Sequence, residues 1–126
     1  MSIESVIVEA LGEKGIRDMV AAFYRKVPGD DLIGPMYPDS DWEGSEERLA
    51  EFLLFRFGLS EDYTQKRGHP RLRMRHMPFS IGEPERDRWL KLMGEAMNEV
   101  GLEGEAHEKL TAFFAQVADF MRNRAD

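Results

Sequence analysis

Residues 68–79 read GHPRLRMRHMPF, and this stretch is the most informative part of the chain. Pro70 precedes and Pro78 follows its central segment, so residues 71–76 can form only a short helix that ends at His76. Five cationic side chains and no acidic one occur from position 66 to position 76, namely Lys66, Arg67, Arg71, Arg73 and Arg75. Such a cluster is compatible with a local anionic ligand, whereas composition alone favours the alternative, a solvated basic surface.

On both sides of this stretch, apolar residues recur with the spacing of α-helices, and no run has the period of two that is typical of a strand. The apolar stripes cover residues 3–11, 16–27, 49–57, 89–100 and 110–121. Glycine or proline, which commonly stop helices, follows four of them: Gly12, Pro28, Gly58 and Gly101. We therefore expect an all-α fold of five or six helices, in a single domain that spans residues 1–126.

Two segments between the expected helices are irregular. Residues 34–38 (GPMYP) contain two prolines and cannot continue a helix, and the next helix is expected to begin near Ser45. Residues 59–70 have little apolar period and are predicted to form a long loop. Loops longer than about 12 residues in a compact domain are usually functional or disordered, and this one leads directly to the basic segment and His76.

Composition excludes several classes of protein. The 126 residues are 42% hydrophobic and 33% charged, which is typical of a globular chain. The absence of cysteine excludes disulfides, zinc–thiolate sites and cysteine nucleophiles, and it suits a cytoplasmic protein. A net charge of −7 disfavours nucleic acid as a partner. The sequence has neither a signal peptide nor an apolar run of about 20 residues, so no membrane association is expected.

The three histidines, His69, His76 and His107, are the candidate metal ligands. A lone histidine is more often structural than a ligand, and His69 and His76 could form a two-histidine metal site only across Pro70. Haem needs one imidazole ligand, an apolar slot and cations near its two carboxylates. Residues 71–79 supply all three, with Leu72, Met77 and Phe79 as the apolar side chains. This context favours His76 as a haem ligand.

The same residues resemble the group II truncated haemoglobins. The resemblance rests on residues 68–76 with Pro78 and Phe79, and on shorter runs at residues 23–25 (FYR), 35–38 (PMYP), 46–49 (EERL) and 85–90 (ERDRWL). It implies a two-over-two helical sandwich around haem b, with His76 as the proximal iron ligand. The chain departs from the family at residues 58–60 (GLS), where a Gly-Gly-Pro turn is usual, and between the first two helices, where a glycine pair is reduced to Gly12. These departures concern loop geometry and not the iron ligand.

The resemblance also implies the other haem-site residues. It assigns to the distal side Tyr24, Tyr37, Ser45, Leu49 and Trp89. It puts Tyr63 and Arg67 near the haem propionates, where the basic cluster adds Arg73 and Arg75 as candidates. The predicted haem contacts further include Leu72, Phe52 and Phe79. For Tyr24, Tyr37 and Trp89, a place in the apolar core or a turn is the alternative.

The expected function is reversible binding of dioxygen, carbon monoxide or nitric oxide at haem iron. Two alternatives stay open. One is a haem enzyme, a peroxidase or a nitric oxide dioxygenase served by a reductase. The other is a helical interaction domain without haem. The sequence is compatible with a monomer or a homodimer.

Overall fold

The computed structural model describes residues 2–68, 70, 71, 74 and 76–124. Within these residues the regular structure is helical, which confirms the predicted all-α class. The α-helices are α1 (Ile3–Ala10), α2 (Gly12–Lys26), α3 (Trp42–Arg56), α4 (Asp62–Arg67), α6 (Glu83–Glu99) and α7 (Gly104–Phe120). Three short 3₁₀ turns, η1 (Val27–Gly29), η2 (Gly34–Met36) and η3 (Asp39–Asp41), connect α2 to α3. No helix in the described ranges is long and apolar enough to cross a membrane.

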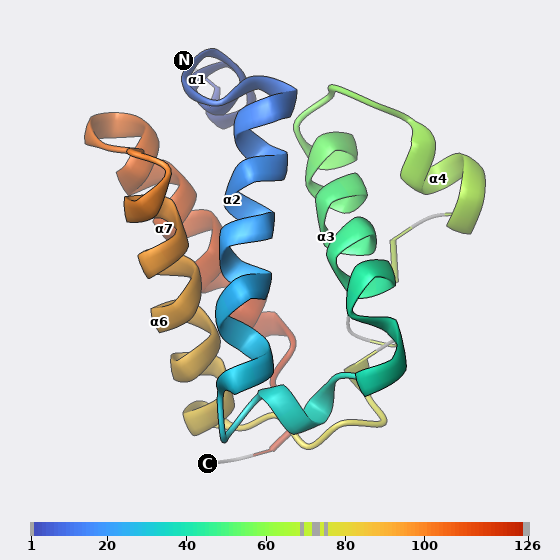
Figure 1. The fold of residues 1–126 in the computed structure, drawn as a ribbon. Helices are drawn as coiled ribbons and strands as arrows, with labels where there is room; N and C mark the ends of the chain where they lie inside the picture. The colour runs from blue at the N-terminus through green and yellow to red at the C-terminus, as the bar shows by residue number, and fades with distance from the viewer. Residues whose placement is uncertain (1, 69, 72–73, 75, 125–126) are drawn as a thin grey trace.

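The long helices form two layers. Helix α2 packs against α3 on one side and against α6 on the other, and α6 packs against α7 (Figure 1). The pair α2–α3 therefore lies on the pair α6–α7, as expected for a two-over-two sandwich. Helix α1 closes one end by packing against α2 and α7. The most deeply buried side chains come from the predicted stripes and include Ile7, Ile16, Phe23, Leu53, Met93 and Leu110.

The segment between α2 and α3 is fixed by Asp30. Its Oδ1 accepts hydrogen bonds from the backbone N–H groups of Leu32 and Ile33, both at 2.9 Å. Its Oδ2 forms an ion pair with Arg88 of α6 at 2.7 Å. Gly34 lies so close to the preceding turn that an added Cβ would stand 2.7 Å from the Val27 carbonyl oxygen, so only glycine fits there. These contacts hold the following residues against α6.

Two predictions from the sequence were wrong, one about the start of a helix and one about a loop. Helix α3 begins at Trp42 and not near Ser45, because Asp41 caps it by accepting a hydrogen bond from the Gly44 N–H at 3.2 Å. The predicted long loop at residues 59–70 contains α4, whose six residues include one buried side chain, Tyr63. A helix of that length has no apolar period, and it depends on contacts with α3. Of the short helix predicted for residues 71–76, Met74 and His76 are helical, whereas Leu72, Arg73 and Arg75 lie outside the described residues.

Candidate functional site

A cavity of about 510 Å³ lies among α2, α3, α6, α7 and the segment that carries His76. Its volume is within the range of about 300–1,000 Å³ that is typical of sites for small molecules and cofactors. The predicted site residues on its wall are Tyr24, Tyr37, Ser45, Leu49, Phe52, Tyr63, His76, Phe79 and Trp89. Helices distant in sequence therefore bring these side chains to one space.

The apolar part of the wall comes mainly from α3 and α7. Besides Leu49 and Phe52 of α3, it includes Ile33, Leu53, Phe113, Phe114, Val117 and Met121. Phe79 lies on the wall but is 39% exposed, so it forms part of the rim. Met77, expected to contribute to the apolar slot, is 53% exposed and does not line the cavity. The slot is thus built mainly from α3 and α7 and less from the residues next to His76.

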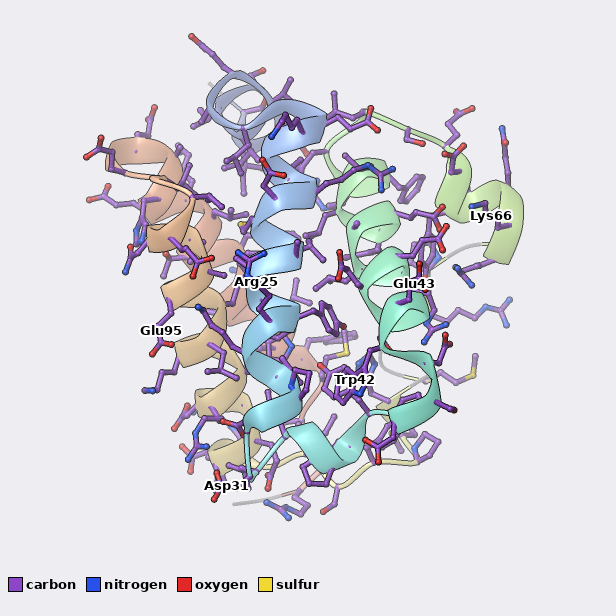
Figure 2. The ribbon with its side chains drawn as sticks, in the orientation of Figure 1. Arg25, Asp31, Trp42, Glu43, Lys66 and Glu95 are labelled. Carbon is purple, nitrogen blue, oxygen red and sulfur yellow. The ribbon has the colours of Figure 1, made fainter. Side chains whose placement is uncertain are left out.

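Aromatic side chains with polar groups form one side of the cavity. Tyr24 of α2 and Tyr37 lie edge to face with ring centroids 5.8 Å apart. Tyr37 also stacks on Trp42 at the start of α3, at 5.5 Å; Figure 2 shows Trp42 between α2 and the lower end of α3. Trp89 of α6 packs against Phe23 and Phe114 at 5.1 and 5.4 Å. Trp42 thus supports the ring of Tyr37.

Burial and hydrogen bonding determine the protonation of the two tyrosines. Burial raises the pKa of Tyr24 far above its ordinary value, and the neighbouring Tyr37 raises it further, first through charge and then through a hydrogen bond. Burial also raises the pKa of Tyr37, while hydrogen bonds with Trp89 and Tyr24 oppose that rise. Both hydroxyls are therefore neutral at physiological pH. A neutral phenol keeps its proton, so this pair of tyrosines can donate to a ligand in the cavity.

Arg48 is a wall residue that sequence reasoning missed. Its Nη2 donates to the Oγ of the buried Ser45 at 3.1 Å, and its Nη1 forms an ion pair with Asp41 Oδ2 at 3.2 Å. Arg48 thus brings a positive charge to the cavity from the first half of α3. Its position three residues after Ser45, on the same helix face, was the signal that could have indicated it. Glu85 and Arg86 of α6 also line the cavity and were not predicted.

Lys66 and Arg67 of the basic cluster contact acidic side chains of α3 and do not line the cavity. Lys66 Nζ lies 2.6 Å from Oε2 of Glu51, a buried carboxylate, and Arg67 Nη2 lies 3.5 Å from its Oε1. Figure 2 shows Lys66 on α4, on the side of α3 that faces away from α6. Arg67 does not line the cavity, but its guanidinium lies 6.0 Å from the ring of Tyr63, which does. The predicted contacts of Leu72, Arg73 and Arg75 fall outside the described residues.

Among the described residues, His76 is the one histidine on the cavity wall. His107 lies on α7, where its Nε2 is 3.1 Å from Asn98 Oδ1. His69 is not described, so the two-histidine alternative stays a prediction. The described part of the chain contains no cluster of three or more His, Cys, Asp or Glu residues that could hold a metal ion. The site therefore offers one imidazole in an apolar, aromatic cavity.

Comparisons with known proteins show the family and the fold of the chain. A family model described as bacterial-like globin matches residues 7–123. The group 2 truncated hemoglobin YjbI of Bacillus subtilis is 38% identical over 118 residues, which cover 94% of this chain and 89% of that protein. The structure of a truncated oxygen-avid haemoglobin from Bacillus subtilis has a TM-score of 0.86 at 39% identity, over 92% of this chain and 98% of that one. The group II truncated hemoglobin of Bacillus anthracis has a TM-score of 0.90 at 32% identity, over 100% and 94% of the two chains.

Proposed function

The chain belongs to the bacterial-like globin family, as a group II truncated haemoglobin, and from this premise we propose that it binds haem b through His76 and reversibly binds dioxygen in the cavity. Relatives named haemoglobins imply a haem cofactor, and a structural relative is described as oxygen-avid. The observation that carries the proposal is the cavity of about 510 Å³ with His76 on its wall. A helical interaction domain without a cofactor has no need for such a space.

The residues present fit haem. Phe52, Phe113 and Val117 offer an apolar surface for the porphyrin ring, and His76 offers the nitrogen ligand that iron requires. When bound, haem supplies ferrous iron, which binds dioxygen, carbon monoxide and nitric oxide reversibly. The protein's contribution is to hold the ring, to limit access of water and to place hydrogen-bond donors next to the gas.

We assign the polar aromatic residues to the distal side of the haem. We take Tyr37 as the donor to the bound gas, because its hydroxyl is neutral and lies at the centre of the hydrogen bonds with Trp89 and Tyr24. Trp89 and Tyr24 would hold this hydroxyl in place beside the ligand. Ser45 and Leu49 of α3 lie on the same cavity and limit the space available to the ligand. This cluster replaces the distal histidine of many other globins.

Arg48 is our first candidate for a propionate partner, because it is a cation on the cavity wall. Arg67 and Tyr63 form a second candidate pair, in which Glu51 holds the guanidinium in place. Arg73 and Arg75 stay candidates on the basis of the sequence. Ion pairs with propionates near the protein surface would be weakened by solvent. Each arginine is therefore expected to contribute only modestly to the affinity for haem.

The wider proposal is that residues 1–126 act as one cytoplasmic globin domain whose partners are small diatomic gases and a reductase that keeps iron ferrous. Titration of the purified chain with haem tests the proposal. We expect one haem per chain, an intense Soret band, and reversible spectral changes when the reduced protein is exposed to dioxygen and then to argon. A chain that binds no haem would refute the proposal. Turnover of peroxide or nitric oxide by the reduced protein would indicate the enzymatic alternative.

A further inference from the structure

Hydrogen bonds connect the segment that carries His76 to the residues that follow α7. Three hydrogen bonds join the side chain of Asn123 to this segment. Its Nδ2 donates to the carbonyl oxygens of His76, at 3.3 Å, and of Phe79, at 2.6 Å. Its Oδ1 accepts from the N–H of Ile81 at 2.8 Å. The backbone N–H of Asn123 donates to the Ile81 carbonyl oxygen, also at 2.8 Å.

These contacts use every hydrogen-bonding atom of the amide. A primary amide has two N–H donors and one carbonyl acceptor, and here both donors and the acceptor are engaged. An aspartate of nearly the same size would keep the acceptor for Ile81 but would have no donor for His76 and Phe79. Alanine would remove all three side-chain contacts. Asparagine is thus specifically suited to this position.

Arg124 extends the same connection toward α6. Its backbone N–H donates to the Ile81 carbonyl oxygen at 3.2 Å, and its Nη1 donates to Ser80 Oγ at 3.0 Å. Its Nη2 forms an ion pair at 2.6 Å with Glu85, whose carboxylate also accepts from the Gly82 N–H at the start of α6. The backbone between His76 and α6 is therefore held at several points by two residues beyond α7.

We propose that Asn123 is a positioning residue that sets the place of the His76 backbone, and through it the reach of the imidazole into the cavity. This inference rests on the proposed function, in which His76 is the iron ligand. The backbone of a ligand residue determines how far and at what angle its ring approaches the metal. Pro78 removes one backbone donor between His76 and Phe79, so external hydrogen bonds contribute more to the order of this segment.

The test compares Asn123→Asp and Asn123→Ala with wild type, using Asn98→Asp as the matched control because Asn98 contacts His107 and not this segment. The iron–histidine stretching band of the reduced protein, measured by resonance Raman spectroscopy, should shift or broaden in both Asn123 variants. Haem transfer to an acceptor globin should become about tenfold faster, as expected when two hydrogen bonds are lost. Asn98→Asp should match wild type in both measurements.

Hydrogen exchange in the haem-free protein provides a readout that does not depend on haem. The Ile81 amide should stay protected in Asn123→Asp, which retains the acceptor, and should exchange faster in Asn123→Ala. If wild type has an iron–histidine band and both Asn123 variants keep its position and the wild-type rate of haem loss, the positioning role is wrong and the proposed function stands. If wild type has no such band, the proposed function fails and this inference fails with it.

Discussion

Tyr37 occupies the centre of the polar cluster on the cavity wall. Its ring is held between Tyr24 and Trp42, at centroid distances of 5.8 and 5.5 Å, and its hydroxyl has hydrogen bonds with Trp89 and Tyr24. A donor held in this way loses little conformational entropy when it binds a ligand. Dioxygen with a partly negative terminal atom is a good acceptor, whereas carbon monoxide is a poor one. The cluster is therefore expected to discriminate between the two gases.

Tyr37→Phe should accelerate the release of dioxygen from the reduced, haem-loaded protein. A hydrogen bond to a charged acceptor is worth about 1.5–3 kcal/mol, so the loss of the donor corresponds to about a tenfold to hundredfold faster dissociation. Stopped-flow displacement measures this rate, and carbon monoxide dissociation should change much less. Trp89→Phe and Tyr24→Phe should have smaller effects, because both residues act through the Tyr37 hydroxyl.

Tyr63→Phe is the matched control for these variants. Tyr63 lines the cavity but packs against Phe52 and Phe55, apart from the polar cluster. Wild-type rates of dioxygen release in Tyr37→Phe, Trp89→Phe and Tyr24→Phe would show that this cluster does not contact the gas.

The raised pKa values of Tyr24 and Tyr37 predict how the haem-free protein responds to alkali. Both residues should stay neutral as pH passes 10, the ordinary pKa of tyrosine. Because their folded-state pKa values are raised, their contribution to stability is complete below pH 10 and is lost as pH rises above it. Ultraviolet titration should show at least two of the three tyrosines ionising above pH 10. Ionisation of all three near pH 10 would contradict the burial of these hydroxyls.

At the scale of elements, the docking of α4 on α3 depends on Glu51. This carboxylate is 4% exposed, and the hydrogen bond from Lys66 holds its pKa below the ordinary value near 4.5, with Arg67 adding to the effect. A lowered folded-state pKa contributes stability that is present above about pH 4.5 and is lost as pH falls through the folded-state pKa. Acid should therefore weaken the contact between α3 and α4.

Glu51→Gln should reduce the free energy of unfolding by about 1–2 kcal/mol at pH 7, because it removes a buried partner of two cations, of which Lys66 is half exposed. Urea unfolding at pH 7 and below pH 4 measures the effect, and the variant should lose less stability than wild type on acidification. Glu47→Gln is the control, since Glu47 is 53% exposed and lies 3.5 Å from Lys66. Equal pH dependence in wild type and Glu51→Gln would contradict the role of this ion pair.

The elements show which features a sequence can predict. Long helices such as α2 and α7 were predictable because each buries an apolar stripe over several turns. Helix α4 was not, because its six residues depend on Glu51, which lies 15 positions before Lys66. The run that ends in His76 indicated the centre of the site. Asn123 was missed, since its contact with His76 spans 47 positions and leaves no local pattern. Arg48 was missed although its spacing of three residues from Ser45 is a local signal.

At the scale of the whole molecule, the two-layer arrangement creates the cavity. Helices α2, α3, α6 and α7 each contribute wall residues, and the segment with His76 crosses from α4 to α6 (Figure 1). A protein interior is normally close-packed, and a space of about 510 Å³ forfeits the contacts that side chains would make there. The proposed haem would restore those contacts. The volume of the cavity therefore supports the proposed cofactor.

His76 is proposed to bind haem iron in this cavity, and haem titration of His76→Ala is the decisive experiment, with His107→Ala as control. Wild type and His107→Ala should each bind one haem, and reduction followed by carbon monoxide should give the same shift of the Soret band in both. His76→Ala should bind haem weakly or not at all, because the remaining apolar contacts supply no iron ligand. A His76→Ala protein that kept one tightly bound haem with the wild-type ferrous spectrum would contradict the assignment.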